Sequence, residues 1–138
     1  MNRAELQQLA NMRLAEARVL VAAGHAPGAY YLAGYVIEWA LKACIARAVR
    51  EHDFPEREKV NQSYSHNLVQ LLKTAGLEAA LESAIRQSQP LADNWAVVKD
   101  WNESKRYSLS LVAQDANDLV AAVGDPGNGV LRWLTQHW

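Results

Sequence analysis

The chain has 138 residues, of which 50% are hydrophobic, 8% aromatic and 21% charged, and its formal net charge is −1. This length fits one domain over residues 1–138 that needs no disulfide or metal to be stable. The apolar fraction, with only 4 Pro and 7 Gly, excludes a disordered chain. The longest apolar run, from Ala26 to Ile37, is too short for a membrane span. The lone Cys44 and the absence of a hydrophobic leader predict a cytoplasmic protein.

The charge is distributed with a mild asymmetry. Residues 1–50 hold six basic and three acidic side chains, a net +3, whereas the remainder holds 8 basic and 12 acidic ones, a net −4. Because this is not a basic arm, nonspecific binding to duplex DNA is not expected. A local cluster of Arg and Lys is still able to hold one nucleotide or a short RNA strand.

Two long helices are predicted at the start of the chain. Apolar residues recur at steps of three and four over residues 2–23, the pattern of an amphipathic helix. Gly24 ends this helix, and Pro27 opens a second one that we expect to run to Arg50. The second helix is apolar on nearly all sides, which is typical of the buried centre of a bundle or of a dimer interface.

The rest of the chain predicts shorter helices. Residues 51–64 indicate a solvated connection, because Asp53-Phe54-Pro55 disfavours helix before the proline. No convincing strand pattern is present, so the expected fold class is an all-α bundle of five to six helices. The remaining predicted elements are a helix capped by Ser63 or Ser65 and ending near Gly76, a helix over residues 78–87, an apolar segment after Pro90, a polar loop over residues 102–109, a helix from Ser108 or Ser110 to about Val123, and a short helix over residues 130–138.

Glu38 and Lys42 are the charged residues of most interest, because they lie four apart on the most apolar helix. One interpretation is an ion pair on a solvent-facing strip of that helix, which contributes roughly 0.3–0.5 kcal/mol when exposed. The other is a polar groove across the bundle, in which Gly34 leaves room for a ligand above Glu38. The sequence leaves both interpretations open.

Three further residues are candidates for a binding site. His66 lies beside a serine at a helix start, where it is either satisfied by a neighbouring carbonyl or carboxylate or serves a ligand as donor or acid/base group. Arg106 and Tyr107 lie in the polar loop, which favours a surface role in phosphate contact and base stacking. Trp95 and Trp101, at helical spacing, are expected in the core.

Metal and nucleophilic chemistry have little support in the sequence. The four histidines lack the close spacings of zinc motifs, and a single cysteine provides no CxxC pair. No GxSxG, phosphate-loop or GxGxxG motif is present. We therefore expect no metal and no cofactor.

The block from Ala29 to Ile45, AYYLAGYVIEWALKACI, resembles the second helix of prokaryotic HEPN-domain proteins. The resemblance covers about residues 5–123 and implies an up-and-down helical bundle that forms a homodimer. It also implies a frequent pairing with a minimal nucleotidyltransferase in toxin–antitoxin or defence systems, and ribonuclease activity in several members. The later blocks in the same order are Ser65-His66-Asn67-Leu68 with Leu71-Leu72, then Asn94-Trp95, Trp101 and Arg106-Tyr107.

The chain departs from the ribonuclease members of that family at their catalytic motif. Those members carry an Arg followed, after four to six residues, by a His at a dimer cleft. Here the corresponding positions after Arg106 read Leu111, Val112 and Ala113. The usual motif is therefore absent or degenerate, and Arg132 with His137 on the terminal helix is the weak remaining candidate pair.

Together these observations predict a non-catalytic or weakly catalytic HEPN-like module that binds a nucleotide, RNA or a nucleotidyltransferase partner. The second helix is the expected homodimer interface. One alternative is a metal-independent endoribonuclease toxin with a displaced Arg/His pair, and another is a purely structural dimerisation or adaptor module. The residues predicted to line the ligand site are Glu38, Lys42, His66, Arg106 and Tyr107.

Overall fold

A computed structural model describes residues 1–49 and 53–138 of the chain. Within these ranges every regular element is helical and no strand is found, which confirms the predicted all-α class. The eight α-helices and one 3-10 helix of this part exceed the five to six helices predicted. Their bounds are α1 Arg3–Ala22, α2 Ala26–Ala48, α3 Arg57–Ser63, α4 Leu68–Thr74, α5 Glu78–Gln87, α6 Gln89–Val98, η1 Glu103–Tyr107, α7 Ala113–Gly124 and α8 Val130–Leu134.

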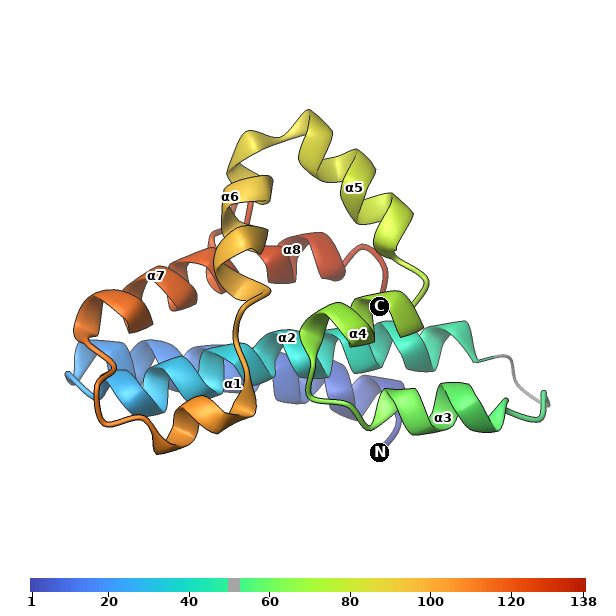
Figure 1. The fold of residues 1–138 in the computed structure, drawn as a ribbon, viewed down its shortest axis with the longest axis horizontal. Helices are drawn as coiled ribbons and strands as arrows, with labels where there is room; N and C mark the ends of the chain where they lie inside the picture. The colour runs from blue at the N-terminus through green and yellow to red at the C-terminus, as the bar shows by residue number, and fades with distance from the viewer. Residues whose placement is uncertain (50–52) are drawn as a thin grey trace.

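Helices α1 and α2 form a long antiparallel pair (Figure 1). The side chain of Asn2 accepts the Glu5 N–H and the Glu5 carboxylate accepts the Asn2 N–H, so a capping box opens α1. Gly24 adopts φ +81°, a left-handed conformation that glycine tolerates, and this allows the chain to reverse direction. Pro27 lies in the first turn of α2, as expected. Arg50, where the sequence placed the end of this helix, lies outside the described residues.

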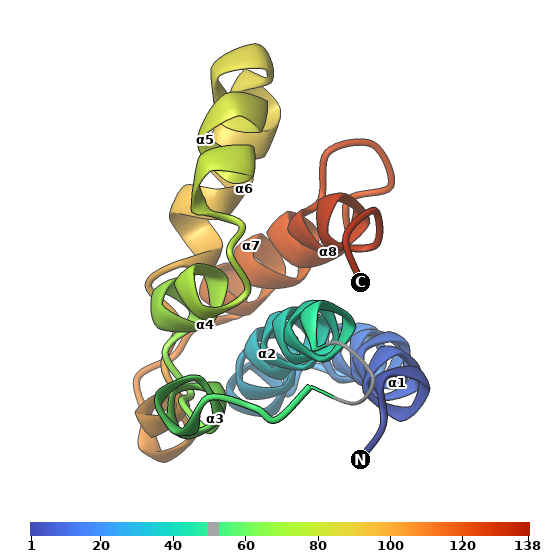
Figure 2. The same cartoon turned by 90° about the vertical axis from the view of Figure 1, so that its right-hand side faces the viewer.

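Helix α2 is the central helix of the bundle. Helices α1, α4, α7 and α8 and the 3-10 helix η1 all pack against it. The end-on view in Figure 2 shows α1 on one side of α2, α4 on the other and α7 with α8 across a third. The apolar character of α2 therefore follows from burial within a single chain, and it does not by itself require a dimer.

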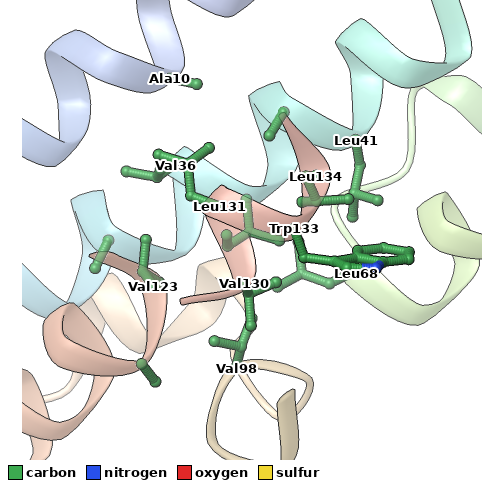
Figure 3. Close-up of a cluster of buried hydrophobic side chains, with 14 of the residues drawn as sticks. Ala10, Val36, Leu41, Leu68, Val98, Val123, Val130, Leu131, Trp133 and Leu134 are labelled. Atoms are coloured by element: carbon green, nitrogen blue, oxygen red, sulfur yellow. The ribbon is translucent and has the colours of Figure 1, made fainter. Parts of the chain in front are cut away.

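The main hydrophobic core lies where α2 meets the C-terminal half of the chain (Figure 3). Val36 and Leu41 of α2 pack there with Val123 of α7 and Leu134 of α8. Full burial of such a side chain stabilises the fold by roughly 1.5–3 kcal/mol. This core fixes α2 in place and so fixes the side chains that α2 presents on its remaining face.

Helices α5 and α6 form an arm that stands away from the bundle (Figures 1 and 2). Leu81 is the buried residue of α5, whereas Leu91 and Val98 anchor α6. The Asn94 side chain donates to the Asn128 carbonyl at 2.9 Å, which ties the arm to the turn before α8. Among the described residues no helix is long and apolar enough to cross a membrane.

The prediction of a connection over residues 51–64 is wrong for its second half, where α3 forms. Helix α3 buries none of its own residues. Its sequence, REKVNQS, has no apolar stripe, so the periodicity gives no signal of a helix. Contacts with α4 position this short helix instead.

Two predicted helix caps are also wrong. The cap of α4 is Asn67, whose side chain accepts the Gln70 N–H at 3.0 Å, rather than Ser63 or Ser65. Helix α7 begins at Ala113, beyond both candidate serines, and Asp115 accepts the Val112 N–H at 3.1 Å. At α4 an asparagine thus takes the N-cap role that sequence spacing had assigned to serine, whereas at α7 the N-cap residue is Val112, which makes no side-chain cap. The polar loop before α7 contains the short helix η1.

Cys44 is enclosed in this core and should be chemically inert in the folded protein. Burial raises the pKa of its thiol to about 12, and its Sγ lies 3.8 Å from the Leu134 carbonyl oxygen. At pH 8 only about one thiol in ten thousand is then ionised, against roughly a quarter of exposed thiols. An aromatic disulfide reagent should label the protein rapidly in urea and at a negligible rate without it. Fast labelling of the native protein would contradict this burial.

Candidate functional site

A row of polar and aromatic side chains lies along one face of α2, next to α4 and η1, which pack against this helix. The spacings of four, three and four residues between Tyr31, Tyr35, Glu38 and Lys42 place them on one side of the helix. His66, from the segment between α3 and α4, and Arg106, from η1, approach the same side. We call these six residues the polar row.

Glu38 is the buried centre of the polar row. Its side chain is 0% exposed, and its Oε1 lies 2.8 Å from the Lys42 Nζ. The Nδ1 of His66 lies 3.0 Å from both carboxylate oxygens. The interpretation of Glu38 and Lys42 as a pair on a solvent-facing strip is therefore wrong, because the carboxylate is sealed beneath its two partners. Glu38 cannot touch a ligand, and it acts by positioning Lys42 and His66.

His66 is held in a defined orientation by this carboxylate. A carboxylate only accepts hydrogen bonds, so Nδ1 carries the proton that it donates to Glu38. The side chain is 46% exposed, and among the described residues no hydrogen bond is made by Nε2. The structure therefore confirms the interpretation in which a neighbouring carboxylate satisfies the histidine, and a role of His66 toward a ligand stays a prediction.

Tyr31 and Tyr35 connect His66 with Arg106. The two phenol oxygens are hydrogen-bonded at 3.2 Å, and the Tyr35 ring lies 6.2 Å from that of His66, centroid to centroid. The neighbouring Tyr35 hydroxyl, and then the Arg106 guanidinium, lower the pKa of Tyr31. Burial, followed by the hydrogen bond with Tyr31, raises the pKa of Tyr35. In this pair the Tyr31 hydroxyl donates and the Tyr35 oxygen accepts.

Arg106 and Tyr107 lie at the exposed end of the polar row, as the sequence predicts for a surface role. The Arg106 Cζ is 4.6 Å from the centroid of the Tyr107 ring, a cation–π contact. The neighbouring Tyr31 phenol is the main cause of its raised pKa. Tyr107 is 72% exposed. Within the described part of the chain no carboxylate forms an ion pair with Arg106, in contrast to Lys42.

Gly34 does not leave room for a ligand, contrary to one interpretation of the sequence. The Trp101 indole packs directly on it, and a Cβ at Gly34 would lie 1.9 Å from the Cε2 of that ring. Trp101 is 2% exposed, which confirms its expected core position, and its ring meets Tyr35 edge-on at 5.2 Å. Trp95 is partly buried against the same core. Trp101, packed on Gly34, thus contacts Tyr35 of the polar row from the core side.

The structure does not bring Arg132 and His137 together into a site. Arg132 is exposed on α8, whereas His137 follows the end of that helix and its ring lies 4.5 Å from that of Trp133. Burial, and then the charge of Arg47, lowers the pKa of His137. No hydrogen bond or ion pair between Arg132 and His137 is present in the described residues, and neither belongs to the polar row.

The sequence interpretation missed Tyr31, Tyr35 and Trp101 as parts of the site. The two tyrosines carried a usable signal, because they share a helix face with Glu38 and Lys42. Trp101 carried none, since its place beneath Tyr35 depends on how η1 folds back against α2. No group of three metal-ligating side chains gathers anywhere in residues 1–49 and 53–138.

Comparisons with protein-family models, with curated proteins and with solved structures find no match to this chain. The resemblance to HEPN-domain proteins therefore stays a prediction that rests on the sequence blocks quoted above. The function must be argued from the geometry of the polar row.

Proposed function

We propose that this chain is a HEPN-like binding module whose polar row holds a phosphate-bearing ligand, a nucleotide or RNA. The observation that carries the proposal is the state of Arg106. Its guanidinium is exposed, forms no ion pair among the described residues, and lies over the Tyr107 ring at 4.6 Å from the ring centroid. A guanidinium fork of this kind matches phosphate oxygens in a bidentate arrangement.

The neighbouring groups suit the rest of such a ligand. The exposed Tyr107 ring offers a face on which a base can stack. His66 presents Nε2 farther along the row, beyond the tyrosine pair. Lys42 contributes less charge to a ligand, because Glu38 already neutralises its ammonium. Arg106 is therefore the principal anchor.

The partner predictions rest on the HEPN resemblance. We propose a homodimer and a minimal nucleotidyltransferase partner in a toxin–antitoxin or defence system. Because α2 is largely buried within one chain, a dimer interface would use its uncovered face or other helices. Light scattering that finds only the 15.4 kDa species at tens of micromolar would exclude the homodimer.

Replacing Arg106 by Ala should weaken ligand binding at least tenfold. A hydrogen bond to a charged group contributes about 1.5–3 kcal/mol, and the guanidinium makes more than one. Calorimetric titration with AMP and with a short 5′-phosphorylated RNA measures the effect. Lys105→Ala is the matched control, since Lys105 is the adjacent exposed cation on η1.

Two outcomes would contradict this assignment. If the wild-type chain binds neither probe, the row is not a phosphate site and the structural-module alternative is favoured. If Lys105→Ala weakens binding as much as Arg106→Ala, the attraction is unspecific charge. The same RNA samples, resolved on a gel after incubation with a chelator, test the endoribonuclease alternative, which requires cleavage without metal.

A further inference from the structure

A cleft of about 370 Å³ lies between the arm formed by α5 and α6 and the last turns of the chain. Figure 1 shows the arm rising beside α8, and α6 contacts α8. None of the six residues of the polar row lines this cleft. Its volume falls in the range of pockets that bind small molecules. The polar part of its lining consists of Gln87, Ser88, Asn128, Arg132 and Gln136.

Hydrogen bonds at the rim hold the two walls of the cleft together. The Ser88 hydroxyl donates to Asn128 Oδ1 at 3.3 Å and accepts the Leu91 N–H at 3.3 Å. The Asn94 side chain donates to the Asn128 carbonyl at 2.9 Å. The Asn128 N–H in turn donates to the Asp125 carboxylate at 2.6 Å. Because the arm and the turn before α8 are linked twice through Asn128, the walls of the cleft are in place without a ligand.

Arg132 supplies the charge of this cleft. Among the described residues that line it, no other side chain is ionised. The Arg132 side chain is exposed and forms no ion pair or hydrogen bond within residues 1–49 and 53–138. Asp125, in the neighbouring turn, accepts the Asn128 N–H instead. A guanidinium fork without a carboxylate of its own chain is able to bind an oxyanion from outside.

The rest of the lining suits a small uncharged body attached to that oxyanion. The Gln87 and Gln136 amides can each donate and accept hydrogen bonds. Leu91 and Trp133, both buried, provide an apolar wall. A single positive charge matches one carboxylate, whereas a phosphate monoester carries close to two negative charges near neutral pH. A carboxylate also accepts two parallel hydrogen bonds from one guanidinium.

We propose that this cleft binds a small monocarboxylate that also carries an amide and a short apolar group, the chemistry of an N-acylated amino acid. The carboxylate pairs with Arg132, the amide meets the glutamine side chains, and the apolar group lies against Leu91 and Trp133. This is a second binding site, and it does not depend on the proposed function of the polar row. It gives Arg132 a binding role that needs no contribution from His137.

NMR titration of the ¹⁵N-labelled protein with N-acetyl-leucine and with N-acetyl-leucinamide tests this inference. The two probes share the amide and the apolar group, and only the first has a carboxylate. We expect N-acetyl-leucine to shift the amide signals of Ser88, Asn128 and Gln136, and to bind at least tenfold more tightly than the neutral probe. Arg132→Gln should weaken its binding at least tenfold, as the loss of a charged hydrogen-bond partner predicts. Acetate should bind more weakly than N-acetyl-leucine, because it has nothing to place against the apolar wall.

Arg86→Gln is the matched control, since Arg86 is an exposed arginine on α5 that pairs with Glu82 and does not line the cleft. It should bind N-acetyl-leucine as the wild type does. The inference is wrong if the two probes bind alike, if Arg86→Gln weakens binding as much as Arg132→Gln, or if acetate or inorganic phosphate binds as tightly as N-acetyl-leucine. Calorimetry of Arg132→Gln with AMP keeps the two sites apart, because it should match the wild type whether or not the polar row binds AMP. A loss of AMP binding in this variant would show that the cleft takes phosphate rather than carboxylate.

Discussion

Gly34→Ala should lower the free energy of unfolding by about 2–3 kcal/mol. An alanine Cβ at this position would lie 1.9–2.2 Å from three atoms of the Trp101 indole. Overpacking of a core costs typically 1–3 kcal/mol and more where the neighbour cannot yield, and the gain in helix propensity returns only about 1 kcal/mol. Trp101 cannot yield cheaply, because it is buried and packed against Tyr35. Urea unfolding followed by circular dichroism measures the change.

Gly127→Ala is the control for this substitution. Gly127 lies in the exposed turn before α8, and its nearest atom to an added Cβ is 3.7 Å away, an ordinary contact. This variant should unfold within about 0.5 kcal/mol of the wild type. If Gly34→Ala is as stable as the wild type, or more stable, then the indole does not occupy this position. In that case the space above α2 would be open to a ligand after all.

Much of the fold was predictable because the helices are indicated by the local spacing of apolar residues. The apolar stripes of α1 and α7, the glycine after α1 and the proline at the start of α2 are short-range signals, and the structure follows them. Helix α3 was not predictable in this way, since its residues are polar all round and bury nothing. The exact caps depend on which of several neighbouring polar side chains reaches a free N–H, which spacing alone does not decide.

The candidate site was predictable only in part, for a different reason. Glu38, Lys42 and His66 were selected by residue type, and the structure joins them through one carboxylate. The burial of Glu38 and the packing of Trp101 on Gly34 depend on tertiary structure. His66 lies 28 residues from Glu38 in the chain, and Trp101 lies 67 residues from Gly34. The sequence interpretation assigned the space at Gly34 to a ligand, but the Trp101 indole occupies it.

Glu38→Met should destabilise the fold by about 3 kcal/mol. The substitution keeps the volume of a fully buried side chain but leaves the Lys42 ammonium, whose side chain is only 16% exposed, without its carboxylate. Removing one partner of a buried pair typically costs 3–5 kcal/mol, and the half-exposed His66 can turn to water and reduce that cost. Urea unfolding gives the free energy of unfolding of each variant.

The double variant Glu38→Met with Lys42→Met separates stability from binding. Replacing a buried ion pair by apolar side chains of similar volume is often neutral or stabilising, so the double variant should recover to within about 1 kcal/mol of the wild type. It should nevertheless bind AMP more weakly, because His66 then has no carboxylate to orient it. Glu82→Met is the exposed control, since its i,i+4 pair with Arg86 lies at the surface and is expected to contribute at most about 0.5 kcal/mol. A double variant that stays as unstable as Glu38→Met would show that the carboxylate is needed for folding itself. One that recovers stability and loses binding would show that Glu38 serves the polar row rather than the stability of the fold.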